Sequence, residues 1–228
     1  MPEQVKIAVL GAPSVGKTSI IHQFIYYCYA GNKFNKKNSK RKSFFQPHAV
    51  INGHLYQLTI VDTPQVDDSQ STNLHEWAEI QCADNDVCDA SCFVLVYDIS
   101  APMSFKYVQV LHDYIVENSN HSDRSSSLDS EYASTSYAPP IIVVGNKRDL
   151  QAKRVFPKRT ISNLVRKYWK CDYLECSAKY NWHVILVFQE LMKKVDSLRH
   201  MSSNNWTSTT DFAVHESSHR NSRKCSIM

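Results

Sequence analysis

The sequence predicts an α/β fold with a mostly parallel sheet and helices on both faces. Short apolar segments of strand length alternate along the 228 residues with segments of helical periodicity. An Asn52–Gly53 pair joins two of the strand-like segments and indicates a hairpin turn. A loop of the form GxxxxGKT follows the first strand and opens the first helix, which is typical of phosphate-binding α/β domains.

The apolar spacing gives the position of each expected element. Strand-length runs of apolar residues lie at Val5–Leu10, Phe45–Ile51, Leu55–Val61, Cys92–Tyr97, Ile141–Val144 and Tyr173–Glu175. Apolar residues that recur every three or four positions predict helices at Lys17–Tyr29, Phe105–Ile115, Ile161–Tyr168 and Val184–Leu198. Parallel strands joined by such helices form one sheet that is covered on both faces.

Composition gives the domain organisation. We expect one domain over residues 1–200, with a serine-rich surface insertion at about 117–138, and a flexible tail over residues 201–228. No apolar run approaches the roughly 20 residues of a membrane-spanning helix, and the N-terminus does not resemble a signal peptide. Seven cysteines without a CxxC pair argue against a disulfide framework and against a zinc site.

Charge is unevenly distributed although the net charge is only +4. No acidic residue lies between Glu3 and Asp62, and the basic residues there concentrate in Lys33–Lys42. This run could bind an acidic protein partner or anionic lipid headgroups. A loop that is simply solvated and binds neither is an equally good interpretation. We expect no nucleic-acid binding, because the pI of 8.6 is moderate and no aromatic pattern accompanies the run.

The first loop motif predicts a phosphate site. Backbone N–H groups and the helix N-terminus would bind phosphate oxygens, Lys17 would add a positive charge, and Thr18 would offer its hydroxyl to Mg²⁺. The candidate phosphate-binding residues are Gly11, Ala12, Pro13, Ser14, Val15, Gly16, Lys17 and Thr18.

Two later motifs predict recognition of a guanine base. Asn146–Asp149 (NKRD) follows an apolar strand, where the Asp149 carboxylate would accept hydrogen bonds from guanine N1 and N2, and the stem of Lys147 would cover a ring face. Glu175–Lys179 (ECSAK) ends the next strand and would offer backbone N–H groups to the guanine O6. Its candidate nucleotide-binding residues are Ser177, Ala178 and Lys179.

In order and spacing, these three motifs resemble those of the Ras-type small GTPases, over roughly Gln4–His200. The segments INGHLYQLTIVD, NKRDL and LVRKYWKCDYLECSAKYNWH are most similar to the Ras-like family 10 group. The resemblance implies a fold of six strands and five helices that binds GTP and GDP with Mg²⁺. It also implies that Tyr29 packs on the guanine edge and that Asp62 joins Thr18 in holding Mg²⁺.

The sequence departs from the family pattern after Asp62. The family has DxxG followed by glutamine, whereas here Gln65 replaces the glycine and Val66 replaces the glutamine that orients the attacking water. We therefore assign no catalytic residue. Gln65 stays a candidate that a changed loop path would bring to the water. The expected activity is weak GTP hydrolysis.

The effector segment departs as well. Lys40 occupies the place of the family's threonine, and Ser39 and Ser43 are alternative substitutes for it. Lys36–Lys42 stands where Ras has an acidic effector-binding segment, so we do not expect the regulators and effectors of Ras to bind. The identities of this protein's effector and exchange proteins stay open.

The C-terminus predicts lipidation. Cys225–Met228 (CSIM) matches a farnesylation box, and basic side chains precede it at Arg220, Arg223 and Lys224. We expect a monomeric, membrane-tethered signalling switch on the cytoplasmic face of a membrane, with the plasma membrane favoured and a cytosolic pool. The alternative is a hydrolysis-deficient nucleotide-binding scaffold that signals by occupancy and partner binding.

Overall fold

The computed structural model describes residues 2–29, 42–63, 73–121 and 138–207. The chain divides into two compact units, Met1–Val195 and Asp196–Met228. The first unit contains the whole sheet. No helix in the described ranges is both long and apolar enough to cross a membrane.

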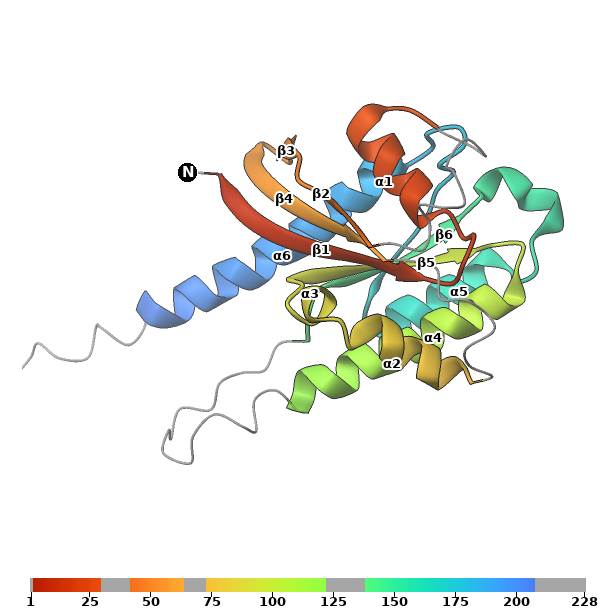
Figure 1. Ribbon diagram of the computed structural model, residues 1–228. Helices are drawn as coiled ribbons and strands as arrows, with labels where there is room; N and C mark the ends of the chain where they lie inside the picture. Colours follow the sequence, from red (N-terminus) through yellow and green to blue (C-terminus); the bar gives the residue numbers. More distant parts are fainter. Residues whose placement is uncertain (1, 30–41, 64–72, 122–137, 208–228) are drawn as a thin grey trace, which may run out of the picture. The chain divides into compact units, whose positions relative to one another are not determined.

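A seven-stranded sheet forms the centre of the first unit (Figure 1). Its parallel strands are β1 (Glu3–Gly11), β4 (His54–Asp62), β5 (Cys92–Asp98), β6 (Ile141–Asn146) and β7 (Asp172–Glu175). Strands β2 (Ser43–Phe45) and β3 (His48–Ile51) both pair antiparallel with β4. The strand order is β2-β4-β1-β5-β6-β7, so the expected mostly parallel sheet is confirmed.

One expected strand, Phe45–Ile51, is divided into β2 and β3. Pro47 has no N–H to donate to a ladder, and its carbonyl oxygen instead accepts from the Leu58 N–H at 3.0 Å. The six expected strands are obtained when β2 and β3 count as one interrupted edge. The expected hairpin turn is confirmed, because Asn52 and Gly53 have φ angles of 53° and 86°.

Helices connect the strands and follow the last of them. They are α1 (Lys17–Tyr26), α2 (Leu74–Cys82), α3 (Asn85–Cys88), α4 (Pro102–His121), α5 (Lys158–Asn163) and α6 (Val184–Thr207). A 3₁₀ helix, η3 (Arg148–Lys153), follows β6, and a π-helical segment, η4 (Leu164–Tyr168), continues α5. With η4 counted as part of α5 and the single turn α3 set aside, these are the five expected helices.

The C-terminal ends of three helices differ from the sequence expectation. Helix α1 ends at Tyr26 rather than Tyr29, because Tyr27 adopts a left-handed conformation with φ 52° and its N–H caps the Gln23 carbonyl. Helix α4 continues to His121, so residues 117–121 are helical rather than part of an insertion. Helix α6 continues to Thr207, beyond the boundary that was expected at residue 200.

Two apolar layers cover the sheet, and Figure 1 shows α1 and α6 on the face opposite α2, α4 and α5. On the first face, Ile20 and Ile21 of α1 pack in one cluster with Phe188 of α6. On the second, the cluster combines Leu111 of α4 and Val165 of η4 with inward residues of β5 and β6. Burial of both faces holds the parallel strands in register.

The register brings the carboxyl ends of the parallel strands to one edge. Val9 pairs with Asp62, Gly11 with Val96, and Asp98 with Asn146. Ligands of open α/β sheets bind at this edge, because the loops that follow the strands meet there. The edge therefore collects the residues of all three predicted motifs.

A buried polar network supports this edge beneath β6 and β7. The Arg154 guanidinium binds both carboxylate oxygens of Glu175 at 2.8 Å each, and their side chains are only 10% and 1% exposed. Tyr173 donates its hydroxyl hydrogen to Glu175 at 2.7 Å and lies 2.8 Å from the Tyr97 hydroxyl. Burial alone would raise the pKa of Glu175, but the hydrogen bonds from Arg154 and Tyr173 leave it below its ordinary value.

We predict that Arg154→Met lowers the free energy of unfolding by about 3–5 kcal/mol, because it leaves a buried carboxylate without its counter-ion. Urea denaturation at pH 7 measures the change, and Arg159→Met, at an exposed position of α5, is the matched control. The folded-state pKa of Glu175 is depressed. The stability that ionised Glu175 contributes to the folded protein is therefore fully present above its ordinary pKa of 4.5 and is lost as the pH falls below that value. A wild type and an Arg154→Met variant of equal stability would contradict this role.

Candidate functional site

The loop between β1 and α1 is shaped by two glycines. Gly16 has φ 99°, and a Cβ there would lie 2.3 Å from the Asn146 side-chain nitrogen. A Cβ on Gly11 would lie 2.2 Å from the Val96 carbonyl oxygen. Both positions therefore require glycine, and the loop can approach its neighbours closely only because these side chains are absent. Residues 11–18 have the strand–loop–helix arrangement that the sequence predicts.

Lys17 is folded back over this loop. Its Nζ donates to the carbonyl oxygens of Gly11 at 2.8 Å and Ala12 at 3.2 Å, and its side chain is buried. Burial lowers the pKa of Lys17 to about 8, against the opposing effect of the Asp62 charge. A buried ammonium group whose hydrogen bonds to the described residues all go to carbonyl oxygens is well placed to pair with an anion above the loop.

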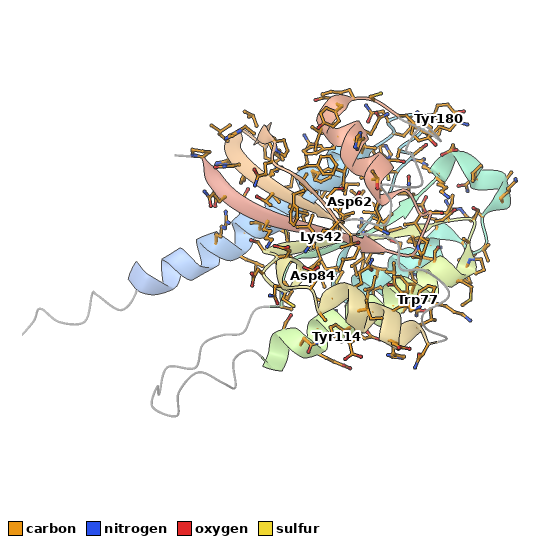
Figure 2. All side chains as sticks on the ribbon, viewed as in Figure 1. Lys42, Asp62, Trp77, Asp84, Tyr114 and Tyr180 are labelled. Carbon is orange, nitrogen blue, oxygen red and sulfur yellow. The ribbon has the colours of Figure 1, made fainter. Side chains whose placement is uncertain are left out.

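Thr18 and Asp62 meet at the end of β4, where Figure 2 labels Asp62. The Thr18 hydroxyl donates to Asp62 Oδ2 at 2.6 Å. The second carboxylate oxygen, Oδ1, is buried and has no hydrogen-bond partner among the described residues. Burial raises the pKa of Asp62, and the Thr18 hydrogen bond and the Lys17 charge oppose that rise. A hydroxyl oxygen beside an unsatisfied carboxylate oxygen fits the all-oxygen ligand preference of Mg²⁺.

Asn146 connects the phosphate loop to the loop that follows β7. Its Nδ2 donates to the Val15 carbonyl oxygen at 2.8 Å, and its Oδ1 accepts from the Ala178 N–H at 3.1 Å. The side chain is buried, and the Cys176 thiol lies 3.5 Å from the same Oδ1. One amide therefore fixes the spacing between the two loops.

Asp149 and Lys147 lie beside this connection. The Ser177 hydroxyl donates to Asp149 Oδ1 at 2.6 Å. Lys147 has φ 62° and its Nζ pairs with Asp98 Oδ2 at 2.7 Å. Burial acts to raise the pKa of Asp98, but hydrogen bonds from Lys147 and Ser100 hold it below its ordinary value. Contacts with Ser177 and Asp98 thus hold the side chains of Asp149 and Lys147 in place.

Most of the predicted site residues lie in the described ranges and come together at the carboxyl edge of the sheet, and the others lie outside those ranges. Tyr29 and Lys179 are both exposed, and they interact electrostatically. Ser43 pairs with Asp62 in the β2–β4 ladder, which places it opposite the candidate metal ligand. The predictions for Lys36–Arg41, Gln65, Val66, Arg220 and Arg223–Met228 fall on residues outside the described ranges.

Gln81 is part of the site's support that the sequence did not indicate. Its Oε1 accepts from the Gly11 N–H at 3.4 Å and from the Tyr107 hydroxyl at 3.2 Å. Its Nε2 donates to the Thr63 hydroxyl at 3.0 Å, and Thr63 in turn donates to the Val9 carbonyl oxygen. This buried glutamine therefore joins α2 to the phosphate loop and to the residue after Asp62.

The signal for Gln81 was weak. Helix α2 has few buried residues, namely Ala78, Gln81 and Cys82, and no predicted element covered it. The sequence indicates Gln81 only as a polar residue on the otherwise apolar inner face of a short helix.

We predict that Asn146→Ala lowers the free energy of unfolding by about 1–3 kcal/mol, because it leaves the Val15 carbonyl and the Ala178 N–H without their shared partner. Asn85→Ala, at an exposed position of α3, is the control and should change stability by less than about 0.5 kcal/mol. Urea titrations of the three proteins provide the comparison. Equal stability of Asn146→Ala and wild type would show that the two loops are positioned independently.

Comparisons with known proteins agree with this geometry. The family model "Ras family" matches residues 6–197. Human Ras-like protein family member 10B is 41% identical over 196 residues, which cover 85% of this chain and 87% of that protein. Mouse Ras-like protein family member 10A is 40% identical over 194 residues, with the same coverage.

A more distant similarity extends to a fission yeast protein. The GTP-binding protein rhb1 of Schizosaccharomyces pombe is 30% identical over 198 residues, covering 84% of this chain and 87% of that protein. The phosphate loop, the Thr18–Asp62 pair and the Asn146 connection lie within the matched region. The chain belongs to the Ras family of small GTPases.

Proposed function

We propose that this Ras-family protein is a guanine-nucleotide-dependent, membrane-tethered switch that hydrolyses GTP slowly. The observation that carries the proposal is the Asn146 amide, which joins the phosphate loop to the base-binding loop. A nucleotide has its base and its phosphates at opposite ends of a ribose, so both loops must be held at a fixed spacing. This spacing suits one nucleotide that contacts both loops.

Asp149 and the loop after β7 would read the guanine base. A carboxylate accepts two hydrogen bonds, so it suits the adjacent N1–H and N2–H groups of guanine and not the pattern of adenine. The Ser177 hydroxyl at 2.6 Å holds the carboxylate in place. Backbone N–H groups of this loop would donate to the guanine O6, and the hydrogen bond from the Ala178 N–H to Asn146 ties the loop to the phosphate loop.

Lys17, Thr18 and Asp62 would bind the phosphates and the metal. Lys17 would exchange its carbonyl contacts for phosphate oxygens, which the positive end of α1 also favours. Thr18 and Asp62 would hold Mg²⁺, which supplies neutralising charge on the β- and γ-phosphates. Asp62 Oδ1, which is buried and has no hydrogen-bond partner in the part of the chain that the structure describes, supports this assignment.

The residues after Asp62 favour slow hydrolysis. Val66 has no hydrogen-bonding group and cannot orient a water molecule, while Pro64 lacks an N–H and restricts the backbone path of Gln65. Lys17 and Mg²⁺ would still neutralise charge, so the reaction is slowed rather than abolished. The same two replacements favour the second candidate function, a nucleotide-binding scaffold that signals without hydrolysis.

Membrane attachment rests on the C-terminal sequence. A single prenyl chain on Cys225 gives weak, reversible binding, and each of Arg220, Arg223 and Lys224 would add about 1 kcal/mol near an anionic surface. We place the protein as a monomer on the cytoplasmic face of a membrane, with a cytosolic pool. Its effectors differ from those of Ras, because Lys36–Lys42 replaces the acidic effector segment.

Base identity tests the proposed function directly. We predict that nucleotide extracted from the purified protein is GDP or GTP. Asp149→Asn should weaken GDP binding by roughly 10- to 1000-fold, because the amide NH2 of asparagine is itself a donor and faces the N1–H and N2–H donors of guanine. Asp89→Asn, at an exposed aspartate, should leave binding unchanged. Chromatography of the extract and competition with ATP provide the measurements. ATP that binds as tightly as GTP would refute guanine recognition.

Hydrolysis should respond to restoration of the family pattern. We predict that the double change Gln65→Gly and Val66→Gln raises the single-turnover rate of phosphate release by about tenfold or more, because it returns a water-orienting amide. Val66→Ala is the control, since alanine also lacks a hydrogen-bonding group, and its rate should match wild type. Wild-type cleavage as fast as that of a stimulated Ras protein would show that another residue orients the water.

Membrane binding should depend on one thiol. We predict that Cys225→Ser moves the protein into the soluble fraction of prenylation-competent cells, because it removes the acceptor of the lipid. Cys88→Ser, at an exposed cysteine of α3, should not change the distribution. Fractionation followed by immunoblotting reports both. An equal membrane-bound fraction for wild type and Cys225→Ser would exclude attachment through prenylation.

A further inference from the structure

Large aromatic side chains lie unusually exposed beside the base-binding motifs. Tyr180 is 52% exposed and Trp182 is 48% exposed, and both belong to the loop between β7 and α6. Their rings stack with centroids 5.1 Å apart and an interplanar angle of 27°. Figure 2 shows Tyr180 on this loop, on the same side of the domain as the end of α1. The stack limits the rotation of Tyr180 without burying it.

Backbone hydrogen bonds join the two ends of the loop that carries the Tyr180–Trp182 stack. Ser177 and Trp182 exchange two backbone hydrogen bonds of 3.0 Å, one in each direction. The Tyr180 N–H also donates to the Ser177 hydroxyl oxygen at 3.4 Å, and this hydroxyl donates to Asp149 at 2.6 Å. Tyr180 is thus attached to the same hydroxyl that positions the base-reading carboxylate.

Lys179 lies over the face of Tyr180. Its Nζ is 5.0 Å from the centroid of the Tyr180 ring, within the range of a cation–π interaction. Its electrostatic neighbours also include Asp149 and Tyr29, both at the base-binding end of the site. The contact with Tyr180 is the largest of those that raise the pKa of Lys179. The Lys179 side chain therefore contacts the Tyr180 ring and lies within electrostatic range of Asp149 in the absence of any ligand.

We propose that Tyr180, backed by Trp182, is a positioning residue that holds the Lys179 side chain against the guanine base and thereby slows nucleotide dissociation. The inference rests on the proposed guanine-nucleotide binding. An exposed lysine that must be ordered on binding loses rotamer freedom, and a lysine that is already held loses less. Loss of this pre-organisation should accelerate dissociation by about two- to tenfold.

The chain contains a matched control for this contact. Tyr168 is 72% exposed, and Lys167 Nζ lies 5.8 Å from the centroid of its ring. The pair is of the same chemical kind as Lys179 and Tyr180, but it lies on η4, which carries no base-binding motif. Tyr168→Leu should therefore leave nucleotide dissociation unchanged.

Dissociation of a fluorescent GDP analogue from the full-length protein, chased with excess GDP and Mg²⁺, tests the proposal. We expect Tyr180→Leu to raise the rate by about two- to tenfold and Tyr168→Leu to leave it at the wild-type value. Lys179→Met keeps the length of the stem but removes the charge that Tyr180 holds. In that background, Tyr180→Leu should have no further effect.

Two outcomes would overturn the inference while leaving the proposed function intact. One is a Tyr180→Leu protein that releases the analogue at the wild-type rate. The other is an equal acceleration by Tyr180→Leu in the presence and absence of the Lys179 ammonium, which would indicate a general effect on the loop. A wild-type protein that binds no GDP analogue would instead refute the proposed function. Thermal melting of each variant confirms that it is folded.

Discussion

The candidate site depends on one side-chain amide. Asn146 donates to Val15 and accepts from Ala178, so a single buried group sets the distance between the loop that would bind phosphates and the loop that would bind the base. The contact is possible because Gly16 has no Cβ, which would lie 2.3 Å from the same amide. A buried polar group with both ends satisfied stabilises one arrangement strongly and penalises any alternative in which an end is left unpaired.

The fold supplies the support that this amide requires. The parallel register places the ends of β1, β4, β5, β6 and β7 at one edge, and apolar layers on both faces fix that register. Beneath the edge, the Arg154–Glu175 pair holds the carboxyl end of β7, from which Ala178 follows. On the other side, Gln81 ties α2 to the Gly11 N–H. The site is therefore fixed by contacts from β6, the loop after β7, and α2.

Sequence reasoning reached the parts of the site that are encoded locally. The phosphate loop and the Asn146–Asp149 motif are defined by spacing along the chain, and they lie after β1 and at the end of β6, the positions in the fold that the spacing predicts. The division of the edge strand at Pro47 depends on a partner residue in β4, and the role of Gln81 depends on three contacts distant in sequence. Contacts of this kind arise from tertiary packing, so local propensity and periodicity could not predict them.

Amide hydrogen exchange tests the coupling of the two loops most directly. Protection should be measured by mass spectrometry for peptides covering residues 11–18 and 176–183, in wild type and in Asn146→Ala under identical conditions. We predict that both peptides lose protection together in the variant, although they lie far apart in the sequence, because one amide restrains both. Loss of protection in only one peptide, or in neither, would contradict the central claim that Asn146 sets the geometry of the whole site.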